Sequence, residues 1–415
     1  MIRIAAMSMR SRRIPIALVI IALTTSMALL LAVERIKQSS QKGFNESLGG
    51  VDLVVGPRGS GLELILYTVF HLGNPTNNIT TETLTDIAAN SAIEWVVPIA
   101  LGDSHRGFRV ISTTNEYFDR IKFAGDQPLS FVEGAAFGEI NQVVLGSDVA
   151  KDLGYRVGSS IFVTHGSESL GKLHDDFAFQ ITGILNPTGT PTDKAVFVSL
   201  EGYELIHLGW ASGSQTLSLK NLDIKTIPKE RLYPKTVTAA YVGLASKLSL
   251  FKVSRSINDY DEEAISAVIP GVELAKLWSI VGTVDSVFKL MNWLIIGISL
   301  ISMVTMTMTG LDSRTREMTI LRALGATPSK LAGMIMMETA LISVVSISLA
   351  IGLVRLLTWG TADIVSQWAG IRIELSWIAA DELLTLWIIV AAGLIASLIP
   401  ASMVYKRSLH QGFSS

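Results

Sequence analysis

Apolar residues are concentrated in four long runs, and the segments between these runs have ordinary polarity. The runs cover residues 14–33, 290–311, 334–354 and 383–404, and the third contains one charged residue, Glu338. Each run is close to the ~20 apolar residues that a helix needs to cross a bilayer. A cleaved signal peptide is the alternative for the first run, but the apolar core of such a peptide is typically about 7–15 residues long. The pattern therefore predicts an α-helical membrane protein with four transmembrane helices.

The charged residues beside these runs predict which segments face the cytoplasm. Residues 1–13, 312–333 and 405–415 together hold ten Lys or Arg residues and two acidic residues. Residues 34–289 hold 22 basic and 29 acidic residues. Because cytoplasmic loops carry the excess of Lys and Arg, we expect both termini and the 312–333 loop in the cytoplasm. Residues 34–289 and the 355–382 loop are then extracytoplasmic.

The long outer segment has the strand and helix patterns of a globular α+β domain inserted between the first and second membrane helices. Its first strand is predicted at residues 51–56, before a Gly-Pro turn, and a helix follows at 62–71. A short helix is predicted with Ser147 or Asp148 as its cap and Gly154 as its stop, and another covers 259–269 with an acidic first turn. The other strands are predicted at residues 108–112, 143–145, 160–164, 177–185, 195–198 and 236–244, and exposed loops at 166–176 and 186–193.

The approach to the second membrane helix carries an apolar stripe at three- and four-residue spacing. No cluster of Pro or Gly separates this stripe from the apolar run that follows. We therefore predict one continuous helix from about residue 277 to 311, roughly 50 Å long. It is either an amphipathic helix packed on its own domain or, as the continuity favours, a rigid stalk between the membrane and the outer domain. The stripe consists of Leu277, Ile280, Val281, Val284, Val287 and Phe288.

Composition and charge exclude several classes of function. The 415 residues are 49% hydrophobic and 17% charged, with a mean hydropathy of +0.44, which is too apolar for an ordinary soluble or disordered chain. The net charge of −2 argues against nucleic-acid binding, which requires a basic surface. The absence of cysteine excludes disulfides, thiol catalysis and Cys-ligated zinc. Without a phosphate-binding G-x-x-x-x-G-K-[ST] loop or a hydrolase motif, the chain is expected to hold no catalytic site and no cofactor.

Two histidines are weak candidates for a metal site. His165 and His174 lie in one polar segment together with Asp175 and Asp176. Imidazole and carboxylate groups are ligands for divalent metals such as zinc. A solvated loop explains the same composition better, so the sequence predicts no metal site.

The loop after the second membrane helix holds the most informative motif. Residues 313–330 read SRTREMTILRALGATPSK and lead into Glu338. The loop resembles the signature of FtsX-like permeases, roughly R-x-R-E-x-x-x-L-R-A-L-G-A before a helix with an early Glu. Residues 400–409 resemble the end of the same family, and VVLG at 143–146 with ITGIL at 181–185 resembles the periplasmic core of MacB-type permeases. With its predicted topology, the resemblance covers nearly the whole chain.

The resemblance implies that this loop docks on a cytosolic ATPase as a short helix parallel to the membrane. Apolar side chains would anchor this coupling helix, charged ones would orient it, and Gly325 would end it in the left-handed conformation. A loop that only touches lipid headgroups is the alternative, and it explains the arginines but not the leucine spacing and the glycine together. The expected docking residues are Arg314, Arg316, Glu317, Met318, Ile320, Leu321, Arg322, Leu324 and Gly325.

Glu338 is the single acidic residue inside a predicted span. Carboxylates within a membrane are costly and often functional, so this position is a candidate site. It lies near the cytoplasmic end of its run, where it can reach the interface or a nearby arginine. An ion pair or an interfacial role is therefore favoured over the handling of a proton or a substrate.

The resemblance implies that the chain is the permease subunit of an ABC transporter complex. In that family two permease copies pair, and separate ATP-binding subunits bind ATP and Mg²⁺ and dock on the cytoplasmic side. We expect a homodimer rather than a heterodimer, in a bacterial inner membrane, in contact with lipids and with a periplasmic adaptor or substrate-binding protein. The implied mechanism is mechanotransmission, in which the outer domain moves to export or extract a lipoprotein, a peptide or a hydrophobic small molecule.

A membrane protein that signals or regulates without transport is the alternative from a different class. The resemblance to FtsX implies that such a permease can control an enzyme outside the membrane. An outer segment of about 250 residues favours the larger MacB-like core over the small outer domain of FtsX. A membrane-anchored enzyme is the third reading, and the sequence offers no catalytic constellation to support it.

Overall fold

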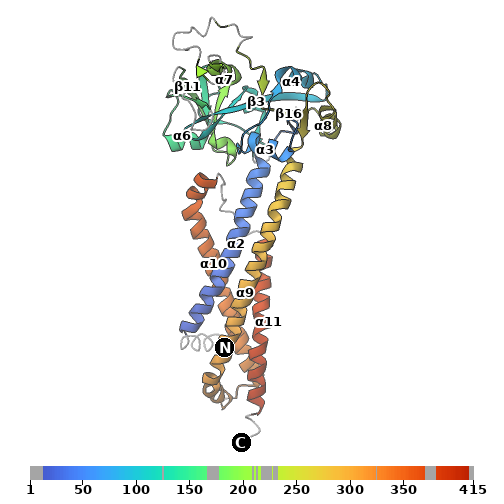
Figure 1. Ribbon diagram of the computed structural model, residues 1–415. Coiled ribbons are helices and arrows are strands. Elements are labelled where there is room, and N and C mark those ends of the chain that lie inside the picture. Colours follow the sequence, from blue (N-terminus) through green and yellow to red (C-terminus); the bar gives the residue numbers. More distant parts are fainter. Residues whose placement is uncertain are drawn as a thin grey trace. The chain divides into compact units, whose positions relative to one another are not determined.

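The computed structural model divides the chain into a helical unit and an α/β unit (Figure 1). It describes residues 13–123, 126–165, 177–207, 210–211, 214–215, 227, 232–323, 325–369 and 380–410, although not every side chain within these ranges. The helical unit combines Met1–Ser39, Val281–Ile364 and Ile373–Ser415. The α/β unit combines Ser40–Ile280 with Val365–Arg372.

Long apolar helices form the helical unit. They are α2 (Arg13–Glu46), α9 (Pro270–Ala323), α10 (Pro328–Ala369) and α11 (Ala380–His410), and one end of each of α2, α9 and α10 is assigned to the α/β unit. Their buried faces share one apolar cluster, which includes Leu23 and Met27 of α2, Ile296 of α9, Ile342 of α10 and Ile389 of α11. Their outer faces also carry large apolar side chains. Helices that are apolar on all sides are typical of a membrane environment.

Three helices in the described part of the chain are long and apolar enough to cross a membrane. These segments are Arg13–Ser39, Ser329–Thr361 and Glu382–Met403, and they correspond to the first, third and fourth predicted runs. A shorter apolar stretch, Ser286–Ile298, lies in α9. The second predicted span, 290–311, extends beyond this stretch into residues whose side chains are only partly described. It therefore stays a prediction.

A mixed sheet of 11 strands forms the centre of the α/β unit. The strand order is β17-β1-β16-β3-β4-β12-β8-β11-β7, and β10 and β9 pair with β3 and β11. Most pairs are antiparallel, but β12 with β4 and β11 with β8 are parallel. The strands are β1 (Leu53–Pro57), β3 (Ile93–His105), β4 (Phe108–Thr113), β7 (Phe131–Gly134), β8 (Gln142–Leu145), β9 (Ser160–Ile161), β10 (Thr164–His165), β11 (Phe179–Leu185), β12 (Ala195–Ser199), β16 (Ala239–Leu244) and β17 (Ile265–Val268).

Shorter elements cover this sheet. The helices are α3 (Gly61–Val69), α4 (Thr81–Ala88), α5 (Glu116–Arg120), α6 (Ser147–Leu153), α7 (Leu200–His207) and α8 (Leu250–Asn258), with 3₁₀ turns η1 (Pro191–Lys194) and η5 (Lys247–Ser249). Three two-residue pairs add β2 (Ile79–Thr80) with β15 (Thr236–Val237), β5 (Lys122–Phe123) with β6 (Gln127–Pro128), and β13 (Trp210–Ala211) with β14 (Ser214–Gln215). Figure 1 shows α4 and α8 near one end of the sheet and α6 and α7 near the other.

Both faces of the sheet are buried near β1. Val54 belongs to one apolar cluster, whereas Leu53 and Val55 belong to a second one. Successive side chains of a strand point to opposite faces, so this division shows core packing on either side. A third cluster, with Phe179 and Val196, lies around β8, β11 and β12. Burial on both faces explains why these strands consist mainly of apolar residues.

The predicted helix at 259–269 is wrong. Residues 261–263 form a bend before β17, and the helix in this region, α8, ends earlier at Asn258. The carboxylate of Glu263 accepts hydrogen bonds from the backbone N–H of Thr80 at 3.0 and 3.1 Å. Thr80 caps α4, so this acidic group stabilises the start of another helix. The acidic residue Glu263 does act at a helix N-terminus, but that helix is α4 and not a helix at 259–269.

Other predicted elements differ from the structure in detail. The strands at 108–112, 143–145 and 195–198 are confirmed as β4, β8 and β12, whereas 160–164 and 236–244 each contain two separate strands. The short helix α6 is preceded by Gly146 at its cap position, not by Ser147 or Asp148. Its stop at Gly154 is confirmed, with φ 69°. No local pattern predicted β3, which contains Pro98 and a register shift after Leu101.

Candidate functional site

The first turns of α9 are part of the core of the α/β unit. Leu274 is buried in the same apolar cluster as Val54, and Leu277 and Trp278 pack against this cluster. Only Ile269 lies between the end of β17 and the first residue of α9. The sheet therefore continues almost directly into the long helix. Hydrophobic packing holds the first turns of α9, from Pro270 to Trp278, which we call its root.

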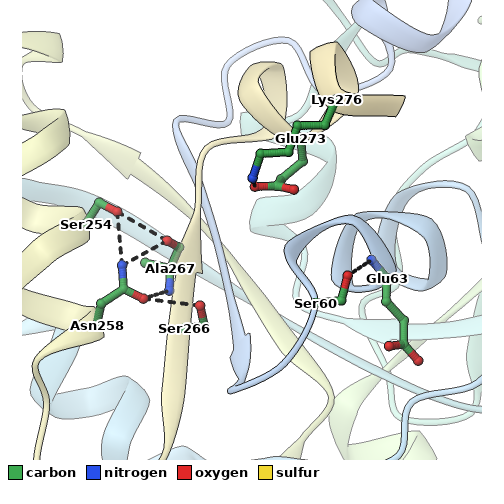
Figure 2. A network of polar contacts seen from close by, with 8 residues as sticks. All are labelled: Ser60, Glu63, Ser254, Asn258, Ser266, Ala267, Glu273 and Lys276. Carbon is green, nitrogen blue, oxygen red and sulfur yellow. Dashed lines mark hydrogen bonds and ion pairs between the residues drawn. The ribbon is translucent and has the colours of Figure 1, made fainter. Parts of the chain in front are cut away.

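Polar side chains, shown in Figure 2, and a glycine stabilise these first turns of α9. Glu273 is buried and pairs with Lys276, with 2.7 Å between Oε1 and Nζ. A Cβ atom at Gly61 would lie 2.8 Å from Cδ of Glu273 and 2.8 Å from Cγ1 of Val268. Such distances are too short for a side chain, so glycine permits the close approach of α3 to the start of α9. Ser60 caps α3 in the same place by accepting a hydrogen bond from Glu63 N.

The edge strand β17 is fixed by side chains of α8 (Figure 2). Oδ1 of Asn258 accepts a hydrogen bond from Ala267 N at 3.0 Å, and its Nδ2 donates to Ala267 O at 3.3 Å. Oγ of Ser254 donates to the same carbonyl at 3.2 Å, and Oγ of Ser266 donates to Oδ1 of Asn258 at 3.2 Å. The amide of Asn258 thus takes the place of a neighbouring strand, which blocks pairing with another chain at this position.

Helix α9 continues without interruption through the predicted stalk and the coupling motif. It comprises 54 residues, from Pro270 to Ala323. Beyond Leu277 the apolar stripe leaves the core, and Ile280, Val287 and Phe288 are exposed. The side chains of Val281 and Val284 are outside the described residues. Gly325 adopts φ 90°, and α10 begins at Pro328.

A buried ion pair joins two helices of the helical unit. Nε of Arg35 on α2 lies 3.2 Å from Oε1 of Glu382 on α11. The two side chains are only 8% and 3% exposed. Burial of two charges is tolerated only when they are paired, so this contact constrains the two helices strongly.

Two family models together match most of the chain. The model described as the MacB-like periplasmic core domain matches residues 16–275, which is more than half of the chain. The model described as the FtsX-like permease C-terminal matches residues 289–409. The chain belongs to the family of MacB/FtsX-type permeases. Such permeases are components of ABC-type systems, work with an ATP-binding subunit and are not themselves ATPases.

Two solved structures are similar to part of this permease. The periplasmic region of MacB from Actinobacillus actinomycetemcomitans is 10% identical, with a TM-score of 0.33, and the match covers 56% of this chain and 94% of that one. The extracellular domain of the noncanonic ABC-type transporter YknZ from Gram-positive bacteria is 12% identical, with a TM-score of 0.30, covering 52% and 98%. No curated protein matches the permease significantly. Its family assignment therefore comes from the two family models.

The coupling motif of this permease is helical but does not form a separate short helix. Its backbone belongs to α9 as far as Ala323, because no proline occurs between residues 283 and 324 to end the helix. The motif is therefore the last part of a long helix and not a separate short one, and its orientation to the membrane stays a prediction. Ile320 is 55% exposed. The side chains of Arg314, Arg316, Glu317, Met318, Leu321, Arg322 and Leu324 are outside the described residues.

Glu338 is buried in the permease near the start of α10. Thr339 beside it and Ser343 further along α10 are buried as well, so this part of the helix presents polar groups to the interior of the helical unit. Glu338 also takes part in a polar or electrostatic contact. Burial with a partner is compatible with the structural role favoured by its position, and a functional role stays untested.

Sequence reasoning missed the Arg35–Glu382 pair and the Asn258 contacts. Arg35 follows the first apolar run closely and Glu382 directly precedes the last one. Opposite charges at corresponding ends of two predicted spans could therefore have suggested an ion pair. Asn258 carries no signal of this kind, because its role depends on the fold around Ala267. The side chains of His165 and His174 are outside the description, and no group of three metal-binding side chains occurs in the described part of the permease.

Proposed function

We propose that this chain is the permease subunit of an ABC transporter complex that transmits ATP-driven motion to its extracytoplasmic domain. The observation that carries the proposal is the continuity of α9. One hydrogen-bonded helix begins at Pro270, is buried in the core of the α/β unit at Leu274, and continues through the coupling motif to Ala323. A helix of 54 residues is about 80 Å long at 1.5 Å per residue, which exceeds the hydrocarbon thickness of a bilayer.

The coupling motif is the proposed docking site of a separate ATP-binding subunit. Apolar residues Met318, Ile320, Leu321 and Leu324 supply the anchors, and Arg314, Arg316, Glu317 and Arg322 supply ion pairs. ATP and Mg²⁺ belong to that partner. Movement of the docked subunit displaces the cytoplasmic end of α9, and the helix carries this displacement to its root.

The proposed topology places both termini and the 312–333 loop in the cytoplasm. Four spans at 14–33, 290–311, 334–354 and 383–404 surround an extracytoplasmic domain at 34–289 and a short outer loop at 355–382. The flanking charges support this orientation in a bacterial inner membrane. We further propose a homodimer, which the exposed apolar side chains of Val287 and Phe288 on α9 support.

The proposed work is export or extraction at the outer face of the membrane. Hydrophobic cargo such as a lipoprotein, an apolar peptide or an amphipathic small molecule fits a permease that acts through its outer domain. A periplasmic adaptor or a substrate-binding protein completes the proposed assembly. Membrane lipids contact the exposed apolar faces of α10 and α11.

Docking is tested by reconstituting the permease with its ATP-binding subunit in lipid nanodiscs. Replacement of Leu321→Asp together with Arg322→Ala is expected to weaken association by about tenfold or more, because anchor residues dominate interface energies. ATP turnover above the level of the free ATP-binding subunit is lost with it. The control variant Lys330→Ala changes an exposed residue that is not among the proposed docking residues, and it keeps both properties. Unchanged association and turnover in the docking variant would contradict the proposal.

A further inference from the structure

A buried pair of charges joins α2 and α11 beside their apolar contact. Arg35 lies near the end of the span Arg13–Ser39, and Glu382 is the first residue of the span Glu382–Met403. One turn further along each apolar segment, Leu31 and Leu386 are both buried in the apolar cluster of the helical unit. The two helices therefore run antiparallel from the charge pair into the apolar interior, as Figure 1 also shows.

Stability alone does not explain a charge pair at this position. Desolvation of two ions offsets most of their mutual attraction, and a pair of well-packed apolar side chains is often equally stable. In the described part of the chain, Nη1 of Arg35 is also buried without a hydrogen-bond partner. The pair is thus imperfectly compensated. A property other than stability must therefore explain why this contact contains two charged residues and not two leucines.

That benefit is the choice of one register between the two helices. Leucine, isoleucine and methionine side chains permit neighbouring registers at similar energy, because apolar contacts are not directional. A buried charge permits only the register that brings it to its partner, as single buried polar residues do in coiled coils. Moving α2 by one turn past α11 would separate the buried Arg35 from Glu382 and break their ion pair.

We propose that Arg35 and Glu382 are positioning residues that lock α2 and α11 together as one rigid pair throughout the working cycle. Separation of the charges in a desolvated place is too costly for a routine step. The lock acts where α2 leaves its apolar span toward the α/β unit. If the chain works as proposed above, motion between helices is confined to other contacts, and α2 and α11 move as one body.

The register is tested in the full chain in nanodiscs, without any partner. The protein has no native cysteine, so the pair Leu31→Cys and Leu386→Cys can be cross-linked selectively with a short bis-methanethiosulfonate. We expect high yield in the presence of the charge pair. Neutralisation by Glu382→Gln or Arg35→Gln should lower the yield by about tenfold, since one buried charge then drives the helices apart or out of register.

A charge swap separates positioning from general loss of folding. The variant Arg35→Glu with Glu382→Arg restores opposite charges at the same two places and should recover most of the cross-link. The variant Arg35→Leu with Glu382→Leu should remain folded but distribute its cross-links between Leu386→Cys and Ile389→Cys as partners of Leu31→Cys. Low yield in the parent background, or equal yield after neutralisation, overturns the proposal.

The rigid-pair part is tested by a covalent bridge between Arg35→Cys and Glu382→Cys in the complex with the ATP-binding subunit. The bridged complex should keep its permease-dependent ATP turnover within about twofold, because the bridge only replaces a contact that does not open. Strong inhibition by the bridge shows that the two helices part during the cycle, and it overturns the rigid pair. A complex without permease-dependent turnover refutes the proposed function instead, while the cross-linking result of the isolated chain still decides the register.

Discussion

At the edge of the sheet, Asn258 makes the hydrogen bonds to the backbone of β17 that a neighbouring strand would otherwise make. Its single amide satisfies both backbone groups of Ala267, which is buried on the strand that precedes α9. Asn258→Ala leaves this N–H without its partner, and we expect a loss of about 1–3 kcal/mol in the free energy of unfolding. Thermal unfolding of the full chain in detergent measures the loss. Ser254→Ala, which removes one of two bonds to the Ala267 carbonyl, should cost clearly less, and equal effects would contradict this role.

His207 makes the stability of the α/β unit depend on pH. Its Nε2 lies 3.6 Å from Oδ1 of the fully buried Asp103, and its Nδ1 donates to Tyr203 O at 2.7 Å. Burial lowers the pKa of His207, but the hydrogen bond and charge of Asp103, with the Tyr203 carbonyl and Glu204, raise the pKa, and the net shift is upward. The folded protein therefore holds this proton more tightly than the unfolded chain does.

The sign of this shift predicts stability that is fully present below the ordinary pKa of ~6.5 and lost as the pH rises through the higher folded value. The melting temperature of the parent chain should fall across this interval. His207→Gln should have a lower melting temperature at acidic pH and a smaller fall as the pH rises. Melting curves of both chains from pH 5 to pH 9 test this prediction. If the melting temperature fell equally with pH in both chains, His207 would not be the source of the pH dependence.

At the scale of elements, α9 is the decisive feature, because its function as a stalk depends on an unbroken hydrogen-bond ladder. Gly282 lies inside it, and an added Cβ there would meet no atom within 4 Å. Gly282→Ala should leave the helix intact and stabilise it by up to about 1 kcal/mol. Gly282→Pro removes a backbone bond at a cost of about 3 kcal/mol or more.

This matched pair tests force transmission. In the complex with the ATP-binding subunit, Gly282→Pro should retain association but lose permease-dependent stimulation of ATP turnover or substrate release by about tenfold, since the helix no longer transmits displacement rigidly. Gly282→Ala should behave like the parent chain. Normal coupling in the proline variant would mean that motion bypasses α9.

At the scale of the whole molecule, orientation in the membrane is the property to test, because charge asymmetry predicts it. The cysteine-free chain permits labelling of one introduced thiol at a time. Leu248→Cys, at a side chain that is 97% exposed in the α/β unit, should react with an impermeant maleimide in spheroplasts. Ser329→Cys, at an exposed position after the proposed docking residues, should react only after permeabilisation. The reverse pattern would contradict the proposed topology.

Local patterns were reliable where one physical requirement acts on neighbouring residues. Bilayer thickness requires long apolar runs, and three of the four predicted runs are found in helices able to span a membrane. The stripe at Leu277 and the absence of proline predicted a helix through the boundary, which α9 confirms. The acidic residues before β17 produced the wrong helix prediction at 259–269, because Glu263 accepts a hydrogen bond from Thr80, which is distant in sequence.

The sequence by itself determined the division into apolar runs and one outer domain, the charge asymmetry and the family motif, because each is a local property of composition or spacing. Only the tertiary structure decided which segments meet. The strand β3, the contact of Asn258 with Ala267 and the pairing of Arg35 with Glu382 across 347 positions all depend on the fold. Such contacts are selected by burial and by the satisfaction of polar groups after folding. A local pattern can mark a candidate residue, as it does for Arg35 and Glu382, but it does not determine which residue becomes its partner.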